Sequence, residues 1–283
     1  MVRQKTFRIT FMHKNNQSYW VFLRTRRLRH FLLSRPFVLR KGRVSMSTVY
    51  QHSTLAALMG KVLGGSATLA ELKEHGDTGI GTFDGLDGEM IMVDGEVYYM
   101  DGEGIIHHVT DMDKTVPFAT VHHAGDPSET VKFSAGNMQE MVSLIDDREL
   151  ENTFSGVILR GSFSYMKVRS APKSERPYPS LSEITKTQRE FEQTDVTGTL
   201  VGYYSPELYQ GTVAAGWHVH FLSDDRTFGG HVLGFDADQL EGDLTIFDNY
   251  ELHLPIDNKE FREHHVDMDG LKEGVAAAEG SQN

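Results

Sequence analysis

The sequence predicts an α+β fold, in which two β-rich halves with mixed, mainly antiparallel sheets carry a few short helices. Three observations lead to this expectation. Apolar residues recur with period two over residues 81–109 and again from residue 196 onward, which is typical of strands. Asp-Gly steps at 87–88, 94–95 and 101–102 favour tight hairpin turns. Helical spacing of apolar residues occurs only in short stretches.

The first half is expected to begin with a short helix. The segment "STLAALMGKVLGG", residues 53–65, opens with a serine suited to an N-cap, repeats its apolar residues at helical spacing and ends in two glycines. A meander of short antiparallel strands follows over residues 81–109. A second helix is expected in "SAGNMQEMVSLIDD", residues 134–147, because its apolar residues again share one helical face.

The middle of the chain predicts a change from one half to the other. The segment "FSGVILRGSFSYMKVRS", residues 154–170, indicates a pair of strands broken near Gly161. A proline-rich loop then leads to a short polar helix around residues 182–193. We therefore divide the chain into an N-terminal half at residues 46–180 and a C-terminal half at residues 181–283, with the functional site where the halves meet.

Charge separates the first 45 residues from the remainder. Residues 1–45 hold 12 of the 28 Lys and Arg residues and no acidic residue, which leaves 16 basic against 40 acidic residues, a net of −24, in residues 46–283. We interpret residues 1–45 as a disordered basic extension with Met46 as the natural start, while an organelle-targeting segment and a nucleic-acid-binding arm stay open. The acidic body argues against nucleic acid as a partner, because phosphate contacts need clustered basic residues.

Three histidines in "GWHVHFLSDDRTFGGHVLGF", residues 216–235, carry the functional prediction. His218 and His220 are two residues apart, so a strand sends both side chains to the same face. The polar loop and two glycines that follow allow a hairpin, which returns His231 opposite His220. The segment therefore predicts that three imidazoles meet on a hairpin of the C-terminal half, although core histidines without a metal are the alternative.

Three converging imidazoles are suited to bind a divalent metal ion. The chain has no cysteine, so a metal has to be held by histidines and carboxylates. Three nitrogen ligands leave a coordination position for water or substrate, which is typical of catalytic sites. We expect Zn²⁺, while Fe²⁺, Mn²⁺ or Ni²⁺ could occupy similar ligands.

Several segments together resemble one enzyme family. "GTFDGLDGEM" (residues 81–90), the histidine segment (residues 216–235) and the terminal "AEGSQN" (residues 278–283) resemble α-acetolactate decarboxylases in order and spacing. The resemblance extends over residues 50–283 and has no counterpart for residues 1–45. It implies a zinc enzyme of acetoin and butanediol formation, which converts (S)-2-acetolactate to (R)-acetoin and carbon dioxide.

The resemblance also implies roles for individual residues. The metal ligands fall on His218, His220 and His231, the catalytic residues on Glu89, Arg169 and Glu279, and a substrate-binding threonine on Thr82. Glu273 is the alternative to Glu279 for the C-terminal carboxylate. The metal is expected to act as a Lewis acid on the keto and hydroxyl oxygens. Glu89 would protonate the enediolate on one face. Arg169 would bind the substrate carboxylate or a developing oxyanion, or else hold Glu89 or Glu279 in place.

Three other functions stay open from the sequence. A cupin-like metal-dependent oxygenase also uses His-x-His and a later His, but commonly with a Glu soon after the pair, where this chain has Asp224 and Asp225. A non-catalytic metal-binding β module would bind zinc and leave acetolactate unchanged. The third alternative is a family member that has lost its activity. The presence of Glu89 and Arg169 argues against it.

Partners and location follow from the same observations. Acetolactate is the expected partner, with no nucleic acid and no membrane, because no stretch approaches the ~20 apolar residues of a span. The resemblance suggests a homodimer. The absence of cysteine fits a cytoplasmic location.

Overall fold

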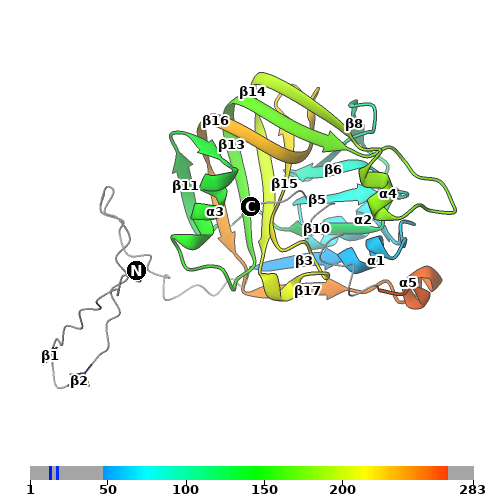
Figure 1. The fold of residues 1–283 in the computed structure, drawn as a ribbon, viewed down its shortest axis with the longest axis horizontal. Coiled ribbons are helices and arrows are strands. Elements are labelled where there is room, and N and C mark those ends of the chain that lie inside the picture. The colour runs from blue at the N-terminus through cyan, green and yellow to red at the C-terminus, as the bar shows by residue number, and fades with distance from the viewer. Residues whose placement is uncertain (1–12, 15–16, 19–46, 126, 267–283) are drawn as a thin grey trace, which may run out of the picture. The chain divides into compact units, whose positions relative to one another are not determined.

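The computed structural model describes residues 13–14, 17–18, 47–125 and 127–266 (Figure 1). Residues 1–41 and 42–283 form separate compact units. In the first unit, the two-residue strands β1 (His13–Lys14) and β2 (Gln17–Ser18) pair antiparallel. The predictions for the remainder of the basic extension, for Met46 and for the C-terminal carboxylate at Glu279 or Glu273 lie outside the described residues.

The first sheet of the second unit has seven strands. In spatial order they are β17 (Asn249–His253), β3 (Thr48–His52), β10 (Phe118–His122), β5 (Thr78–Phe83), β6 (Asp87–Val93), β7 (Glu96–Met100) and β8 (Ile106–Val109). All pairs are antiparallel except β17 with β3, so the sheet is mixed, as predicted. Asp94 and Gly95 form the predicted tight turn between β6 and β7, both with positive φ.

The second sheet is built around three long strands, and it closes on itself. Its path is β11 (Glu129–Phe133), β16 (Gly229–Ile246), β13 (Ser155–Ser170), β14 (Arg189–Ser205) and β15 (Gly216–Ser223), and β12 (Gly136–Asn137) pairs with β16. The start of β16 also pairs with β15, which joins the two ends of the β16–β13–β14–β15 run. A separate two-stranded ribbon pairs β4 (Ala67–Thr68) with β9 (Thr115–Val116).

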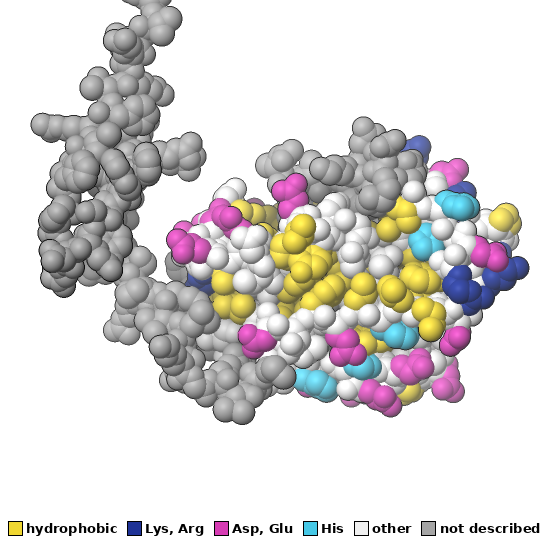
Figure 2. Space-filling view, turned by 90° about the horizontal axis from the view of Figure 1, so that it is seen from below, with side chains coloured by type: hydrophobic (Ala, Val, Ile, Leu, Met, Phe, Trp, Pro, Cys, Tyr) yellow, Lys and Arg dark blue, Asp and Glu magenta, His cyan; other side chains and the backbone are white. Residues whose placement is uncertain are grey.

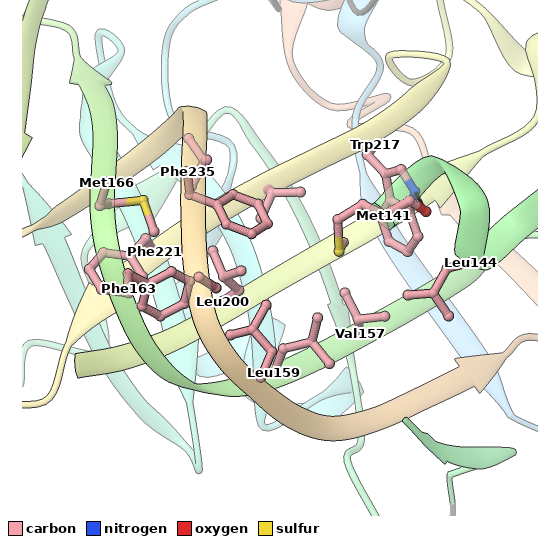
Figure 3. Close-up of a cluster of buried hydrophobic side chains, with 14 of the residues drawn as sticks. Met141, Leu144, Val157, Leu159, Phe163, Met166, Leu200, Trp217, Phe221 and Phe235 are labelled. Carbon is pink, nitrogen blue, oxygen red and sulfur yellow. Dashed lines mark hydrogen bonds between the residues drawn. The ribbon is translucent and has the colours of Figure 1, made fainter. Parts of the chain in front are cut away.

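The second sheet has an apolar cluster on each face. One face packs against α3 (Met138–Asp146), where Met141 and Leu144 meet Val157, Leu159 and Leu200 (Figure 3). The opposite face meets the first sheet through a second cluster, whose members are Val49, Ile80, Ile91, Val93, Val201, Tyr203, Leu222 and Phe247. Strand alternation directs successive residues into these two clusters, so a side chain between the sheets has neighbours from both.

Short helices complete the α+β fold. They are α1 (Leu55–Met59), α2 (Leu69–His75), α3, α4 (Leu181–Thr185), the single 3₁₀ turn η1 (Glu207–Tyr209) and α5 (Lys259–Glu263). The first helix begins after Thr54, whose side chain caps it, and ends at Gly60 instead of reaching the glycines at 64–65. Lys61 has φ 67°, which stops the helix there. Within the described residues no helix has the length and apolar content to cross a membrane.

The sequence predicted a break in the strands near Gly161 and a division of the chain at residue 180, and neither one separates the second sheet into parts. β13 continues through Gly161 as one strand, although its pairing with β16 is irregular between Ser162 and Tyr165. A Cβ on Gly161 would lie 1.9 Å from the Gln239 carbonyl oxygen, so the glycine permits the close approach of β16. The polar helix expected over residues 182–193 ends at Thr185, and β14 begins at Arg189. Residue 180, where we divided the chain, therefore lies between two paired strands of one sheet.

Candidate metal centre and active site

The alternation of β15 separates its histidines from its apolar residues. Trp217, Val219 and Phe221 belong to the cluster on the α3 side of the sheet. His218 and His220 occupy the alternate positions, so they point toward the first sheet, as the spacing in the sequence predicts. The apolar side chains of β15 therefore pack in the cluster on the α3 side, and its two imidazoles face the space between the sheets.

Register brings His231 and Arg169 onto the same face. His231 on β16 lies directly opposite His220 on β15, as predicted from the hairpin. His231 also lies directly opposite Arg169 on β13. Side chains of directly opposed residues emerge on the same side of a sheet, so three neighbouring strands align these residues in one row.

The three histidines are close enough to share one ion. Each offers a ring nitrogen, and the three nitrogens lie within 4.8 Å of one another, which makes them the one such group of three found within the described ranges. The Nε2 atoms of His218 and His220 are 3.2 Å apart. The Nδ1 atom of His220 lies 2.9 Å from the Met90 carbonyl oxygen, which fits a donated N–H and leaves Nε2 as the lone-pair nitrogen.

Burial keeps the imidazoles of His218 and His220 uncharged. Desolvation, with a smaller contribution from the charge of Arg169, lowers the pKa of His218 to about 3. Desolvation and the neighbouring His218 lower the pKa of His220 well below its usual value. Neutral imidazole is the form that binds a metal, and three converging imidazoles match the donor set of catalytic zinc sites. The donor set therefore fits a divalent cation.

Glu89 reaches the histidines from the first sheet. It lies on β6, and its Oε2 atom is 3.4 Å from Nε2 of His220. Its side chain is 13% exposed, so it is partly accessible to a molecule in the site. Thr82, which we expected to contact substrate, lies on the adjacent strand β5 and donates a buried 2.8 Å hydrogen bond from Oγ1 to the Gly88 carbonyl oxygen.

Arg169 is the buried cation of the site. It is 8% exposed, and its Nε atom has no hydrogen-bond partner among the described residues. Burial of an unpaired guanidinium N–H costs free energy unless a ligand accepts from it, so this atom indicates an anion or a polar oxygen as the missing partner.

All six described candidates line one pocket. It has about 560 Å³ of empty space, counting its open mouth, and its lining residues are Leu55, Leu58, Gly81, Thr82, Leu86, Glu89, Phe118, Arg169, Ala171, Leu181, Gln188, His218, His220 and His231. One wall is therefore charged or polar and the other is leucine-rich. Such a combination suits a small molecule that has both a carboxylate and methyl groups.

Sequence reasoning missed three parts of this pocket. The apolar wall comes from α1, α4 and the β5–β6 turn, where Leu55, Leu181 and Leu86 looked like ordinary core residues. Gln188 carried no signal, because a lone glutamine in a polar stretch is usually exposed. The Met90 carbonyl is a backbone group, and its position depends on packing between the sheets.

Several other histidines of the described residues have structural partners. His122 shares a 2.7 Å hydrogen bond with the hydroxyl of Tyr203. His253 and His52 share a hydrogen bond between their Nδ1 atoms, which are 3.0 Å apart. His107 and His108 stack on Tyr99 and Tyr98 and contact carboxylates.

Comparison with known proteins gives consistent matches. The family model described as alpha-acetolactate decarboxylase matches residues 49–268. The alpha-acetolactate decarboxylase of Methanosarcina mazei is 40% identical over 209 residues, which cover 73% of this chain and 72% of that protein. That of Lactococcus lactis subsp. lactis is 34% identical over 235 residues, or 83% of this chain and 99% of that protein. The crystal structure of alpha-acetolactate decarboxylase from Bacillus subtilis strain 168 superposes with a TM-score of 0.78 at 31% identity, covering 83% of this chain and 100% of that chain.

Proposed function

Because the chain belongs to the α-acetolactate decarboxylase family of carboxy-lyases, we propose that it converts (S)-2-acetolactate to (R)-acetoin and carbon dioxide with a bound zinc ion. The observation that carries this proposal is the meeting of three histidines, Glu89 and Arg169 in one pocket. Other divalent cations fit the same nitrogens, so the identity of the metal is part of the proposal.

Arg169 would bind and orient the substrate. Acetolactate carries one carboxylate, and the guanidinium of Arg169 can donate two parallel hydrogen bonds to it. Arg169 is buried, and burial strengthens this charged contact relative to water. The leucine-rich wall, formed by Leu55, Leu58 and Leu86 with neighbouring residues, would accommodate the methyl groups. The two walls together would fix which end of the molecule faces the histidines.

Loss of carbon dioxide leaves an electron pair that has to be stabilised. Acetolactate is a β-keto acid, so the pair from the broken C–C bond moves toward the ketone oxygen and gives an enediolate. His218, His220 and His231 would hold the metal, which when bound supplies Lewis acidity toward the keto and hydroxyl oxygens. Each 1.36 kcal/mol of stabilisation that is specific to the transition state raises the rate about tenfold.

Glu89 would complete the reaction as the proton donor. The planar enediolate can accept a proton on either face of the carbon that lost carbon dioxide, and a fixed donor selects one face. The Glu89 carboxyl reaches the pocket from the first sheet, across from the strands that carry the histidines. A proton delivered from that side alone would give a single enantiomer of acetoin. A further role for Glu279 stays a prediction.

Incubation of the metal-loaded protein with racemic acetolactate tests this function. Acetoin release, followed by chiral chromatography, is expected to give one enantiomer, (R)-acetoin, above the slow spontaneous reaction. Buffer with zinc alone is the control for spontaneous decarboxylation, and the metal-stripped protein is the control for metal dependence. Release no faster than in buffer, or racemic acetoin, would contradict the proposal. Oxygen uptake in the presence of Fe²⁺ would instead indicate an oxygenase.

We also propose that the protein is a homodimer, as the family resemblance implies, and that it is cytoplasmic, which the absence of cysteine supports. Large apolar side chains are exposed around η1 and after β17, including Leu208 at 86% and Ile256 at 65%. Figure 2 shows hydrophobic side chains gathered across the face that carries β17. Apolar surface of this kind supports an interface between subunits. Light scattering after size-exclusion chromatography measures the mass, and a monomer at micromolar concentration would contradict the dimer.

A further inference from the structure

The position of Glu89 depends on an irregularity in its strand. We propose that Thr82 is a positioning residue, which holds a β-bulge at Gly88 and thereby aims the Glu89 carboxyl at the histidines. This inference rests on the proposed role of Glu89, and it differs from the substrate contact that the sequence led us to expect for Thr82. Its basis is the pairing of β5 with β6.

The bulge places two residues of β6 opposite one residue of β5. Gly81 pairs with Met90 and Phe83 pairs with Asp87, so the register shifts between them. Thr82 alone therefore faces both Gly88 and Glu89. A bulge of this kind bends its strand and redirects the side chain at the irregularity, and it is frequent beside active sites.

Gly88 is the residue that makes the bulge possible, and its surroundings leave no alternative to glycine. Its φ is +72°, and an added Cβ would lie 2.3 Å from the Met100 carbonyl oxygen. Its N–H donates to the Leu86 carbonyl oxygen at 2.9 Å and is also 3.2 Å from that of Ala171. Its own carbonyl accepts the 2.8 Å hydrogen bond from Thr82 Oγ1. The Thr82 hydroxyl is thus the side-chain group that holds the peptide between Gly88 and Glu89.

The two peptides on either side of Gly88 connect the two halves of the site. Glu89 follows Gly88 directly, and it shares the inter-sheet face of β6 with Ile91, which packs against the second sheet. Ala171, which contacts the Gly88 N–H, lies two residues after Arg169. Rotation of the peptide between Gly88 and Glu89 would therefore move the Glu89 carboxyl relative to both the histidines and Arg169.

A substrate contact and a positioning role predict different behaviour. The hydroxyl hydrogen of Thr82 is already donated to Gly88, so it is not available to a substrate oxygen. If Thr82 positions Glu89, its loss should slow the protonation step and leave substrate binding intact. Misplacement of a catalytic group by about 1 Å can reduce the rate on the order of 100-fold.

Two variants separate these roles, with a third as the matched control. Thr82→Val keeps the shape and removes the hydroxyl, whereas Thr82→Ser keeps the hydroxyl. Thr78→Val removes a buried hydroxyl from the same face of β5 outside the pocket. We expect Thr82→Val to lower kcat about 10- to 100-fold with KM within about threefold of wild type. Thr82→Ser and Thr78→Val should stay within about threefold in kcat, and zinc content should be unchanged throughout.

Crystal structures of the Thr82 variants give a readout that does not need the reaction. In Thr82→Val the Glu89 carboxyl should be displaced or spread over several positions, and in Thr82→Ser it should keep its distance to His220. An unmoved Glu89 in Thr82→Val, or a raised KM with unchanged kcat, would overturn the inference. If the wild-type protein fails to decarboxylate acetolactate, the proposed function fails, and the Glu89 positions still decide the role of Thr82.

Discussion

Arg169 on β13 and His231 on β16 are directly opposed in the second sheet. His231 is in turn opposed to His220 on β15, so hydrogen-bonded strands set the spacing between the guanidinium and two of the imidazoles. Such spacing is rigid, because any change of register moves every side chain of the strand. The pairing of the strands therefore holds Arg169 at a fixed distance from His231 and His220.

His220→Ala should remove metal and activity together. The variant loses one of the three nitrogen donors. The lost imidazole is also the one that the Met90 carbonyl oxygen orients through Nδ1. Loss of a group that only orients a ligand costs about 10- to 100-fold in affinity, so loss of the ligand should cost more. Zinc per chain, measured by mass spectrometry after dialysis, checks this. His107→Ala, on the exposed edge of the first sheet, is the control, and full zinc occupancy in His220→Ala would contradict the trio.

Glu89→Gln should keep the metal and lose turnover. The amide has the shape of the carboxyl but cannot supply its proton, and positioned general acids contribute about 10²- to 10⁴-fold. Steady-state acetoin release should fall within that range while zinc content stays at the wild-type level. Glu96→Gln, whose carboxylate contacts the exposed His108, is the matched variant. Near-normal release from Glu89→Gln would remove this residue from the mechanism.

Arg169→Lys should weaken substrate binding. Lysine keeps the charge but cannot form the paired hydrogen bonds of a planar guanidinium. A hydrogen bond to a charged group contributes about 1.5–3 kcal/mol, so kcat/KM should fall about 10- to 100-fold, mainly through KM. Arg160→Lys provides the comparison, because Arg160 lies on the same strand and contacts Asp94 at the surface. An equal fall in kcat/KM in both variants would show that Arg169 does not bind the substrate.

Acid should destabilise the fold between about pH 6.5 and pH 4. Burial lowers the pKa of His122 to about 4, and burial and the neighbouring His253 lower that of His52 to about 4. An unfolded histidine titrates near 6.5, so within this window the unfolded chain binds protons that the folded chain does not. This contribution to the free energy of unfolding is fully present above the pKa of an unfolded histidine. It is lost as the pH falls toward 4, by up to about 3 kcal/mol for each histidine.

Urea unfolding near pH 7 and near pH 5 measures this dependence. His122→Asn cannot titrate and can still bond to Tyr203, so its free energy of unfolding should change less between the two pH values. The attribution to His122 would be wrong if its variant lost stability as steeply as wild type.

The sequence alone determined the local part of this site. Strand alternation places His218 and His220 on one face, and the glycines at 229–230 allow the hairpin that returns His231, because both effects depend on neighbouring residues only. The turn at Asp94-Gly95 and the helix α3 follow from equally local signals. The motifs around these histidines and around Glu89 were also sufficient to predict the family.

The tertiary structure decided which distant residues meet. Arg169 reaches the histidines through the pairing of β13 with β16, and Glu89 reaches them from another sheet through the bulge at Gly88. β13 continues past Gly161 as one strand, and the glycine permits the close approach of β16. These contacts join segments that are far apart in the chain, so their register is set by packing between sheets and not by any local pattern of residues.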